Sequence, residues 1–321
     1  MTRSSAGWPS AGRSSVNDPG SLVSTSPEAS GAGAGTGPAS PVGAPVISTA
    51  PGRDDQEDLA GWNLAAGRLP EPATAIRSRR ALMLMSIRDV TDREPLAQEI
   101  FDEIAIDIVE GRLRPGESLN SVDLSRRFGT SRTPVREALA ELERHGVVVV
   151  PPRRRPYVAR ATLKQVKDVY ELRANLFSLV SELIVDSCPD ERIAELWKWQ
   201  EALEDDVARE SVDDYFWHNV GFRLVEVGLS GNGELQRTLH ALGLRTLQFR
   251  HLSLSQPGRI QRSAADHRRL LMAYEERDKI AATGMTRTLI MAGYRAIERS
   301  GLIGGSLAVT DEPEADTRGT R

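Results

Sequence analysis

The chain has little of what defines disulfide-stabilised or membrane-embedded proteins. Cys188 is the one cysteine in 321 residues, so no disulfide can form within the chain, and a reducing, cytoplasmic location is expected. Apolar runs such as residues 81–87 are much shorter than the roughly 20 residues that a membrane span needs. Aromatic residues are only 5% of the chain, which favours helical cores built from Leu, Ala and Val.

Residues 1–90 have few large apolar side chains and are rich in Ser, Gly, Ala and Pro. Such a segment buries too little apolar surface to offset its ordering entropy, so we expect a disordered tail. It also lacks the apolar region of a secretory signal. A true translation start at Met83 or Met85 is the alternative. Residues 303–321 are predicted to be a second tail.

Residues 111–158 follow the order helix, tight turn, helix and basic hairpin. Arg114-Pro115-Gly116 predicts a turn, and Ser121 stands where the N-cap of a first helix belongs. Gly129 is placed to end that helix. Thr133-Pro134 predicts the start of the second helix, with proline at its first position. This order is typical of a winged helix-turn-helix domain, which we place at residues 91–160.

The second helix is predicted to run to about His145 with one buried face. Val135, Leu139 and Leu142 recur at three- and four-residue spacing, which leaves the other side of the first turn exposed. A recognition helix reads base edges with its N-terminal residues. The candidate DNA contacts on this turn are therefore Ser131, Arg132, Thr133 and Arg136.

A basic hairpin follows the second helix. Residues 147–150 predict one strand and Tyr157-Val158 the return strand, and the turn between them carries Arg153, Arg154 and Arg155. Residues 112–160 hold eleven arginines and five acidic residues, although the formal charge of the chain is −4. One basic stripe on an acidic chain favours site-specific DNA binding over general coating of nucleic acid.

Two of these runs, Phe128-Gly-Thr-Ser-Arg-Thr-Pro-Val-Arg-Glu-Ala-Leu139 and Gly111-Arg-Leu-Arg-Pro-Gly116, resemble the GntR family of bacterial transcription regulators. The resemblance implies that Ser131, Arg132 and Arg136 contact DNA and that the wing adds contacts to a short palindromic operator, with no cofactor required. The family's wing tip has a glycine after arginine. Here Arg155-Pro156 replaces it, so we expect a differently shaped wing.

The remainder, residues 161–302, has the apolar spacing of helices throughout. The predicted fold class is therefore mainly α: the winged helix-turn-helix followed by an antiparallel all-α bundle. Six helices are expected, at about residues 166–183, 194–209, 213–227, 235–255, 263–276 and 279–300.

Four short motifs in this region resemble the FCD effector domain of the FadR-like GntR regulators. They are Tyr170-Glu-Leu-Arg173, Asp214-Tyr-Phe-Trp-His218, Gly231-Asn232 and Asp266-His-Arg268. The resemblance implies a homodimer with a small-molecule pocket inside the bundle, and many members sense small organic acids or sugar acids.

The same motifs predict a weak divalent-metal site, zinc-like in its ligands, at Asp214, His218 and His267. Asp214 and His218 are four residues apart and share one helix face. His267 matches the family's next ligand, but the family's last histidine is absent near Thr288 and Leu289. Water or an effector carboxylate would complete the shell. The alternative is an Asp–His hydrogen bond without metal.

Arg173 stands in an otherwise apolar helix, and a buried arginine needs a partner. A ligand carboxylate could accept both hydrogen bonds of its guanidinium. The alternative is an internal salt bridge with Asp214 or a glutamate. Arg245 and Arg250 are further candidates for effector binding, whereas His240 and His251 are expected to be structural.

The leading hypothesis is a ligand-responsive transcription regulator and not an enzyme. An effector in the bundle would shift the two winged domains of the dimer and change their affinity for the operator. Two alternatives remain: a metal-dependent enzyme that uses Asp214, His218 and His267, and a nonspecific nucleoid-binding protein.

Overall fold

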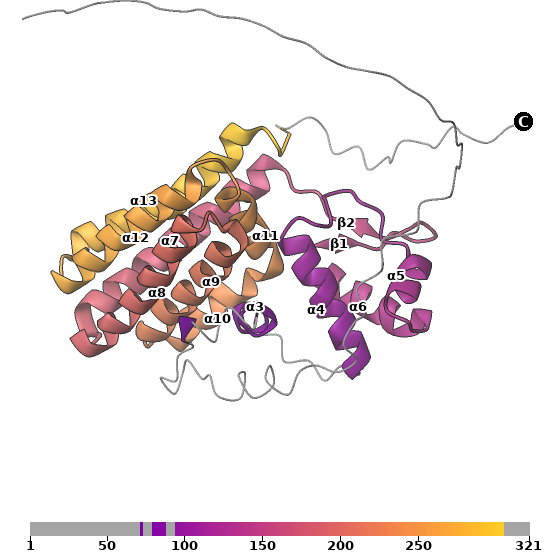
Figure 1. Ribbon diagram of the computed structural model, residues 1–321, viewed down its shortest axis with the longest axis horizontal. Coiled ribbons are helices and arrows are strands. Elements are labelled where there is room, and N and C mark those ends of the chain that lie inside the picture. Colours follow the sequence, from indigo (N-terminus) through magenta and orange to yellow (C-terminus); the bar gives the residue numbers. More distant parts are fainter. Residues whose placement is uncertain (1–70, 73–78, 88–93, 305–321) are drawn as a thin grey trace, which may run out of the picture. The chain divides into compact units, whose positions relative to one another are not determined.

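The computed structural model describes residues 71–72, 79–87 and 94–304. In this part of the chain it has eleven helices, α3 to α13, and one two-stranded sheet. A winged helix-turn-helix precedes a helical bundle (Figure 1), so the predicted fold class is confirmed. None of the helices in these ranges is long and apolar enough to span a membrane.

The winged domain consists of α4 (Pro95–Val109), α5 (Ser121–Arg127), α6 (Arg132–Arg144), β1 (Val148–Val149) and β2 (Tyr157–Val158). The two strands are antiparallel, with Val148 opposite Val158. The turn before α5 joins this sheet, because the Gly116 amide donates to the Val158 carbonyl at 2.8 Å.

The helix ends follow the predicted signals with small shifts. Asn120, one residue before the predicted cap, accepts a hydrogen bond from the Val122 amide at 3.0 Å. Pro134 is the third residue of α6, still in the first turn, where a backbone N–H has no partner within the helix. Gly129 and Gly146 end α5 and α6 at φ +61° and +71°, a conformation that favours glycine.

The bundle contains seven helices instead of the predicted six. The expected helix at residues 235–255 is split at Gly243, whose φ of +62° interrupts the helical path. The helices are α7 (Leu163–Ser187), α8 (Asp190–Ala208), α9 (Val212–Leu229), α10 (Gly233–Ala241), α11 (Gly243–Leu254), α12 (Arg259–Glu275) and α13 (Lys279–Ser300).

Helix α9 is the buried centre of the bundle. Every residue from Tyr215 to Val227 is buried, so this helix has no solvent-facing side over that length. It packs along α8, and α13 packs along α7. A Cβ at Gly221 would lie 2.0 Å from two ring carbons of Trp199, so the close approach of α8 and α9 requires glycine there.

Helix α3 (Arg79–Ile87) lies in the segment that was expected to lack structure. Its apolar residues include Leu82 and Met83, both 0% exposed, and it contacts α4, α9, α10 and α11. The expectation for residues 1–90 is therefore wrong at 79–87, because the short apolar face of this segment packs against α4, α9, α10 and α11. Residues 1–70 and the tail after residue 304 lie outside the described residues.

Candidate functional sites: an exposed arginine surface and a buried arginine cavity

The first turn of α6 presents polar side chains to solvent. Ser131 is the N-cap residue and makes no capping hydrogen bond with its side chain. Arg132, Thr133 and Arg136 are exposed beside it, as predicted, while Val135 on the opposite face is fully buried. This orientation leaves the turn free to meet a DNA groove.

The wing turn carries Arg153, Arg154 and Arg155, all exposed. The Arg154 amide donates to the Pro151 carbonyl at 3.3 Å and closes a four-residue turn. Arg153 has φ +60°, where glycine is usual, so the strained position is Arg153 and not the Arg155-Pro156 step. The wing keeps its three arginines at the tip despite the missing glycine.

Arg132, Arg136, Arg153, Arg154 and Arg155 together form what we term the arginine surface. None of their guanidinium groups hydrogen-bonds or ion-pairs with any residue that the structure describes. Some other arginines of the same domain are paired, such as Arg127 with Asp107 at 2.8 Å and Arg144 with Glu141. Five unpaired guanidinium groups thus lie at the start of α6 and at the wing tip.

A second group of arginines lies inside the bundle. A cavity of about 50 Å³ is lined by Arg173 of α7, Arg223 of α9 and Arg250 of α11, which are 4%, 4% and 8% exposed. We term it the arginine cavity. Its wall also includes Ser86, Phe177, Val220, Leu224, His240, Thr246 and Leu247.

One carboxylate faces these three positive charges. Arg223 Nη1 donates to Glu226 Oε2 at 2.6 Å, and Tyr274 donates its hydroxyl to Glu226 Oε1 at 2.9 Å. Arg250 Nη2 donates to the backbone oxygen and Oδ1 of Asn219, at 3.0 and 2.7 Å. The local charge therefore stays positive, which favours an anion in the cavity.

Arg173 has neither an ion pair nor a hydrogen bond among the described residues. Its guanidinium lies over the rings of Tyr170 and Phe177, 5.6 and 5.5 Å from their centres. Burial, and then the charge of Arg223, lower the pKa of Arg173 to about 10. Burial also lowers the pKa of Arg250 well below its usual range, with further lowering by Arg173 and Arg223. Neither cation has a carboxylate from the described part of the chain bonded to it, so little offsets the loss of its hydration.

The cavity brings two of the three predicted effector residues together, and their role in effector binding stays a prediction. Arg173 and Arg250 line it, and the alternative salt bridge of Arg173 with Asp214 is absent. Arg245 does not line it; its guanidinium lies 5.8 Å from the centre of the Phe249 ring. Arg223 was missed, although a lone arginine in the apolar run of α9 carries the same signal that identified Arg173. His240 lines the cavity, and His251 Nε2 pairs with Asp213 at 2.8 Å.

The structure does not bring the predicted metal ligands together. Asp214 lies in the first turn of α9, where Arg79 Nη2 donates to Oδ1 and the Ser211 hydroxyl to Oδ2, each at 2.9 Å. His218 pairs through Nδ1 with Asp206 of α8 at 2.5 Å. In the described ranges no three His, Cys, Asp or Glu side chains form a group that could hold a metal.

His267, the third predicted ligand, is fully buried and bonded at both ring nitrogens. Nδ1 donates to the Ser263 carbonyl at 2.7 Å, and Nε2 accepts from Asn219 Nδ2 at 3.2 Å. Burial, followed by the charge of Arg223, lowers the pKa of His267 well below its usual range, so the ring is neutral. Thr288, at the place of the family's last ligand, is exposed. Other partners bond to the three predicted ligand side chains in the structure, so metal binding here stays a prediction that the geometry does not support.

The cavity is connected to the winged domain through α4. Glu110, at the C-terminal end of α4, accepts a hydrogen bond from Trp217 Nε1 of α9 at 2.7 Å. Arg79 of α3 donates to the same carboxylate at 2.8 Å. Helix α11 also packs against α4. Two helices of the cavity wall therefore contact the first helix of the winged domain.

Comparison with known proteins assigns two segments. Residues 96–158 match the family described as bacterial regulatory proteins, gntR family, and residues 168–292 match the FCD domain. The Nta operon transcriptional regulator of Aminobacter aminovorans is 31% identical over 175 residues, which cover 54% of this chain and 82% of that protein. The uncharacterised HTH-type regulator YdhC of Bacillus subtilis is 28% identical over 189 residues, 59% of this chain and 84% of that protein.

A solved structure supports the fold. The Escherichia coli protein McbR/YncC superposes with a TM-score of 0.54 at 23% identity, over 65% of this chain and 99% of that protein. At this identity the similarity supports the arrangement of the helices and no ligand or operator.

Proposed function

Because this chain belongs to the GntR family of bacterial regulatory proteins and carries an FCD domain, we propose that a small organic anion in the arginine cavity controls its affinity for operator DNA. Its class, a DNA-binding transcriptional regulator, follows from the family. The effector is inferred from one observation: three buried guanidinium groups line one cavity, and the one carboxylate of the described residues bonded to any of them is Glu226, which pairs with Arg223.

In this proposal the arginine surface binds DNA in two ways. Arg132 and Arg136, with Ser131 and Thr133, enter the major groove at the start of α6, where an arginine can donate two hydrogen bonds to guanine. The wing arginines contact phosphates, which adds affinity that depends on salt. A homodimer would present two such helices related by a twofold axis, so its operator would be a short palindrome.

The effector would be a carboxylate held mainly by Arg173. Its guanidinium has no competing acceptor and can donate two parallel hydrogen bonds. Arg250 and Arg223 add positive charge, although each already uses one nitrogen on a protein acceptor. Phe177, Val220 and Leu224 supply apolar walls for a short carbon chain.

Coupling to DNA would pass through α9 and α11. Both helices carry cavity residues, and both contact α4. An anion that draws Arg223 and Arg250 together moves these helices and, through the Trp217–Glu110 hydrogen bond, the winged domain. The ligand changes DNA affinity only if it binds the two arrangements with different affinity.

This function needs binding and release but no chemical step. The metal-dependent enzyme loses its basis because Asp214, His218 and His267 have other partners. Nonspecific coating of DNA agrees poorly with a net charge of −4 and with unpaired arginines grouped at the start of α6 and at the wing tip.

The proposal is tested by comparing acids with their uncharged analogues. Acetate, succinate and gluconate are titrated into the full-length protein, each beside its amide, and the melting temperature is measured. An acid that raises it while its amide does not is then added to a DNA-binding titration. We expect a change of roughly 5- to 150-fold in DNA affinity, the usual range of coupling between two sites. Binding of an acid with unchanged DNA affinity would contradict the proposed coupling. Arg173→Met, beside the exposed control Arg269→Met, shows whether the acid occupies the cavity.

A further inference from the structure

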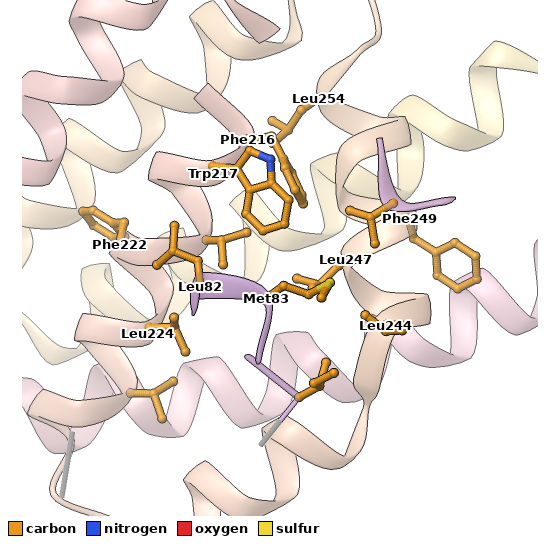
Figure 2. Close-up of a cluster of buried hydrophobic side chains, with 14 of the residues drawn as sticks. Leu82, Met83, Phe216, Trp217, Phe222, Leu224, Leu244, Leu247, Phe249 and Leu254 are labelled. Carbon is orange, nitrogen blue, oxygen red and sulfur yellow. The ribbon is translucent and has the colours of Figure 1, made fainter. Parts of the chain in front are cut away.

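Helix α3 lies outside both segments that match known families, yet it forms part of the cavity wall. The matches cover residues 96–158 and 168–292, whereas α3 spans Arg79–Ile87. Figure 2 shows Leu82 and Met83 among the apolar side chains of the bundle, which include Trp217 of α9 and Leu247 of α11. This helix, outside both matched segments, packs as part of the core.

The bundle helices that α3 contacts are the ones that line the cavity. It packs against α9, α10 and α11, each of which contributes residues to the cavity wall. Ser86 lines the cavity itself, and its hydroxyl donates to the Leu82 carbonyl at 2.7 Å. A segment distant in sequence therefore closes one side of a site whose other sides belong to the bundle.

The cavity is smaller than most ligand pockets, so an effector of usual size needs one wall to move. The volume of the cavity is about 50 Å³, whereas ligand pockets usually begin at about 300 Å³. The bundle walls hold one another in place: α9 is buried all round, and Gly221 allows no further approach to Trp199. Helix α10 is as short as α3, but links of three residues and one residue tie it to α9 and α11. Helix α3 has nine residues. Its displacement opens the cavity while the bundle stays packed.

We propose that residues 79–87 are a lid that closes the arginine cavity and that the lid leaves its groove when an effector enters. The role of the cavity as an effector site rests on the proposed function. That α3 limits access to Arg173, Arg223 and Arg250 rests on the packing alone, and it can be tested without any effector.

Charged contacts at the start of the lid connect it to both domains. Arg79 bridges Glu110 of α4 and Asp214 of α9, and Arg80 Nε pairs with Asp102 of α4 at 2.5 Å. Lid opening breaks these pairs and releases α4 from one of its attachments to the bundle. A single movement of the lid would therefore change both access to the cavity and the position of the winged domain.

The test measures how fast the cavity arginines react with phenylglyoxal in the full-length protein, followed by peptide mass spectrometry. In the unaltered protein Arg173, Arg223 and Arg250 should react much more slowly than exposed Arg154. Leu82→Glu places a charge in the lid's buried face, and we expect cavity labelling to rise about tenfold or more as the lid opens locally. Ile280→Glu is the matched control, because Ile280 is 86% exposed on α13.

The buried thiol of Cys188 separates lid opening from unfolding. It is 5% exposed at the end of α7 and should remain unreactive toward a disulfide reagent if the bundle is intact. Faster cavity labelling with protected Cys188 supports the lid. Unchanged labelling with protected Cys188, or fast labelling of the unaltered protein, overturns it.

If Leu82→Glu exposes Cys188, two milder variants, Leu82→Ala and Arg79→Ala, replace it. Each is assessed by the same readouts, labelling of the cavity arginines and protection of Cys188. Labelling uses neither effector nor DNA. A failure of the lid is therefore distinguishable from a failure of the proposed function.

Discussion

The arginine surface and the arginine cavity hold the same side chain in opposite environments. On the surface the guanidinium groups are exposed and unpaired, and water solvates them. In the cavity three guanidinium groups are at least nine-tenths buried with one carboxylate nearby. Exposed guanidinium groups keep their hydration, so the surface arrangement costs little free energy and can bind a large polyanion. The buried groups have lost their hydration, so the cavity arrangement is unfavourable until a small anion binds.

The two environments should give anion binding different sources of free energy. An exposed arginine gains from DNA chiefly by releasing counterions, so its contribution depends on salt. A buried arginine has already lost its hydration, so a bound carboxylate returns much of that free energy and is little screened by salt. The following substitutions test this contrast, from the largest expected effect to the smallest.

Arg136→Ala should have the largest effect, on DNA binding. Loss of a two-bond contact to a base weakens binding by about 1–3 kcal/mol per half-site, and a dimer has two half-sites. The measurement is a titration with selected operator DNA, with Arg295→Ala on the bundle as control. Unchanged affinity would show that the first turn of α6 does not face the groove.

Arg173→Met should make the protein more stable while removing its response to the effector. Replacing a buried, unpaired cation with an apolar chain stabilises the fold by about 1–4 kcal/mol, as for other buried charges. Urea unfolding at neutral pH measures the change, and Arg269→Met controls for loss of an exposed arginine. A less stable variant would mean that Arg173 holds the bundle together.

Replacing Arg153, Arg154 and Arg155 by Ala should change the salt dependence more than the sequence preference. Each lost phosphate contact lowers the slope of log affinity against log salt by about 0.9. The slope is measured between low and moderate salt for specific and unrelated DNA. If the slope stays the same, the wing points away from the backbone.

Acid should destabilise the bundle through His267. The folded protein keeps this histidine neutral, while the unfolded chain binds a proton below about pH 6.5. Its stabilising contribution is therefore complete above that pH and falls by about 1.4 kcal/mol per unit as the pH decreases. Urea unfolding of His267→Gln between pH 7.5 and 5.5 should show a flatter dependence. Parallel curves would contradict a buried neutral ring.

The smallest effect is expected at Arg153→Gly. This residue holds φ +60° in the wing turn, and glycine relieves a strain of about 1 kcal/mol while it loosens the unfolded chain. The net change in unfolding free energy should be below about 1 kcal/mol. Arg154→Gly, at a position without positive φ, is the control, and equal effects on unfolding would contradict the strain.

Local signals predicted much of the fold. Gly129 and Gly146 end helices because only a residue without Cβ adopts their backbone angles at low cost, and that property is visible in the sequence. The apolar periodicity located the bundle helices, because it too is a local property that is visible in the sequence. The break at Gly243 was missed because a single glycine inside an apolar pattern is often tolerated.

The sites were less predictable because they depend on distant partners. The spacing of Asp214 and His218 is a local fact, but Arg79, 135 residues earlier, binds the carboxylate of Asp214. Likewise, the side chain of Leu82 is buried against residues far away in the sequence. Its burial depends on a groove that only the folded bundle creates, so composition could not predict the lid.

The hydrogen bond between Trp217 and Glu110 has a thermodynamic consequence. If it transmits a signal from the cavity to the winged domain, the transmission must be reciprocal. Operator DNA then changes the effector's dissociation constant by the same factor by which the effector changes that of DNA. Under the proposed function, the effector concentration that half-fills the cavity would therefore depend on how many operators are occupied.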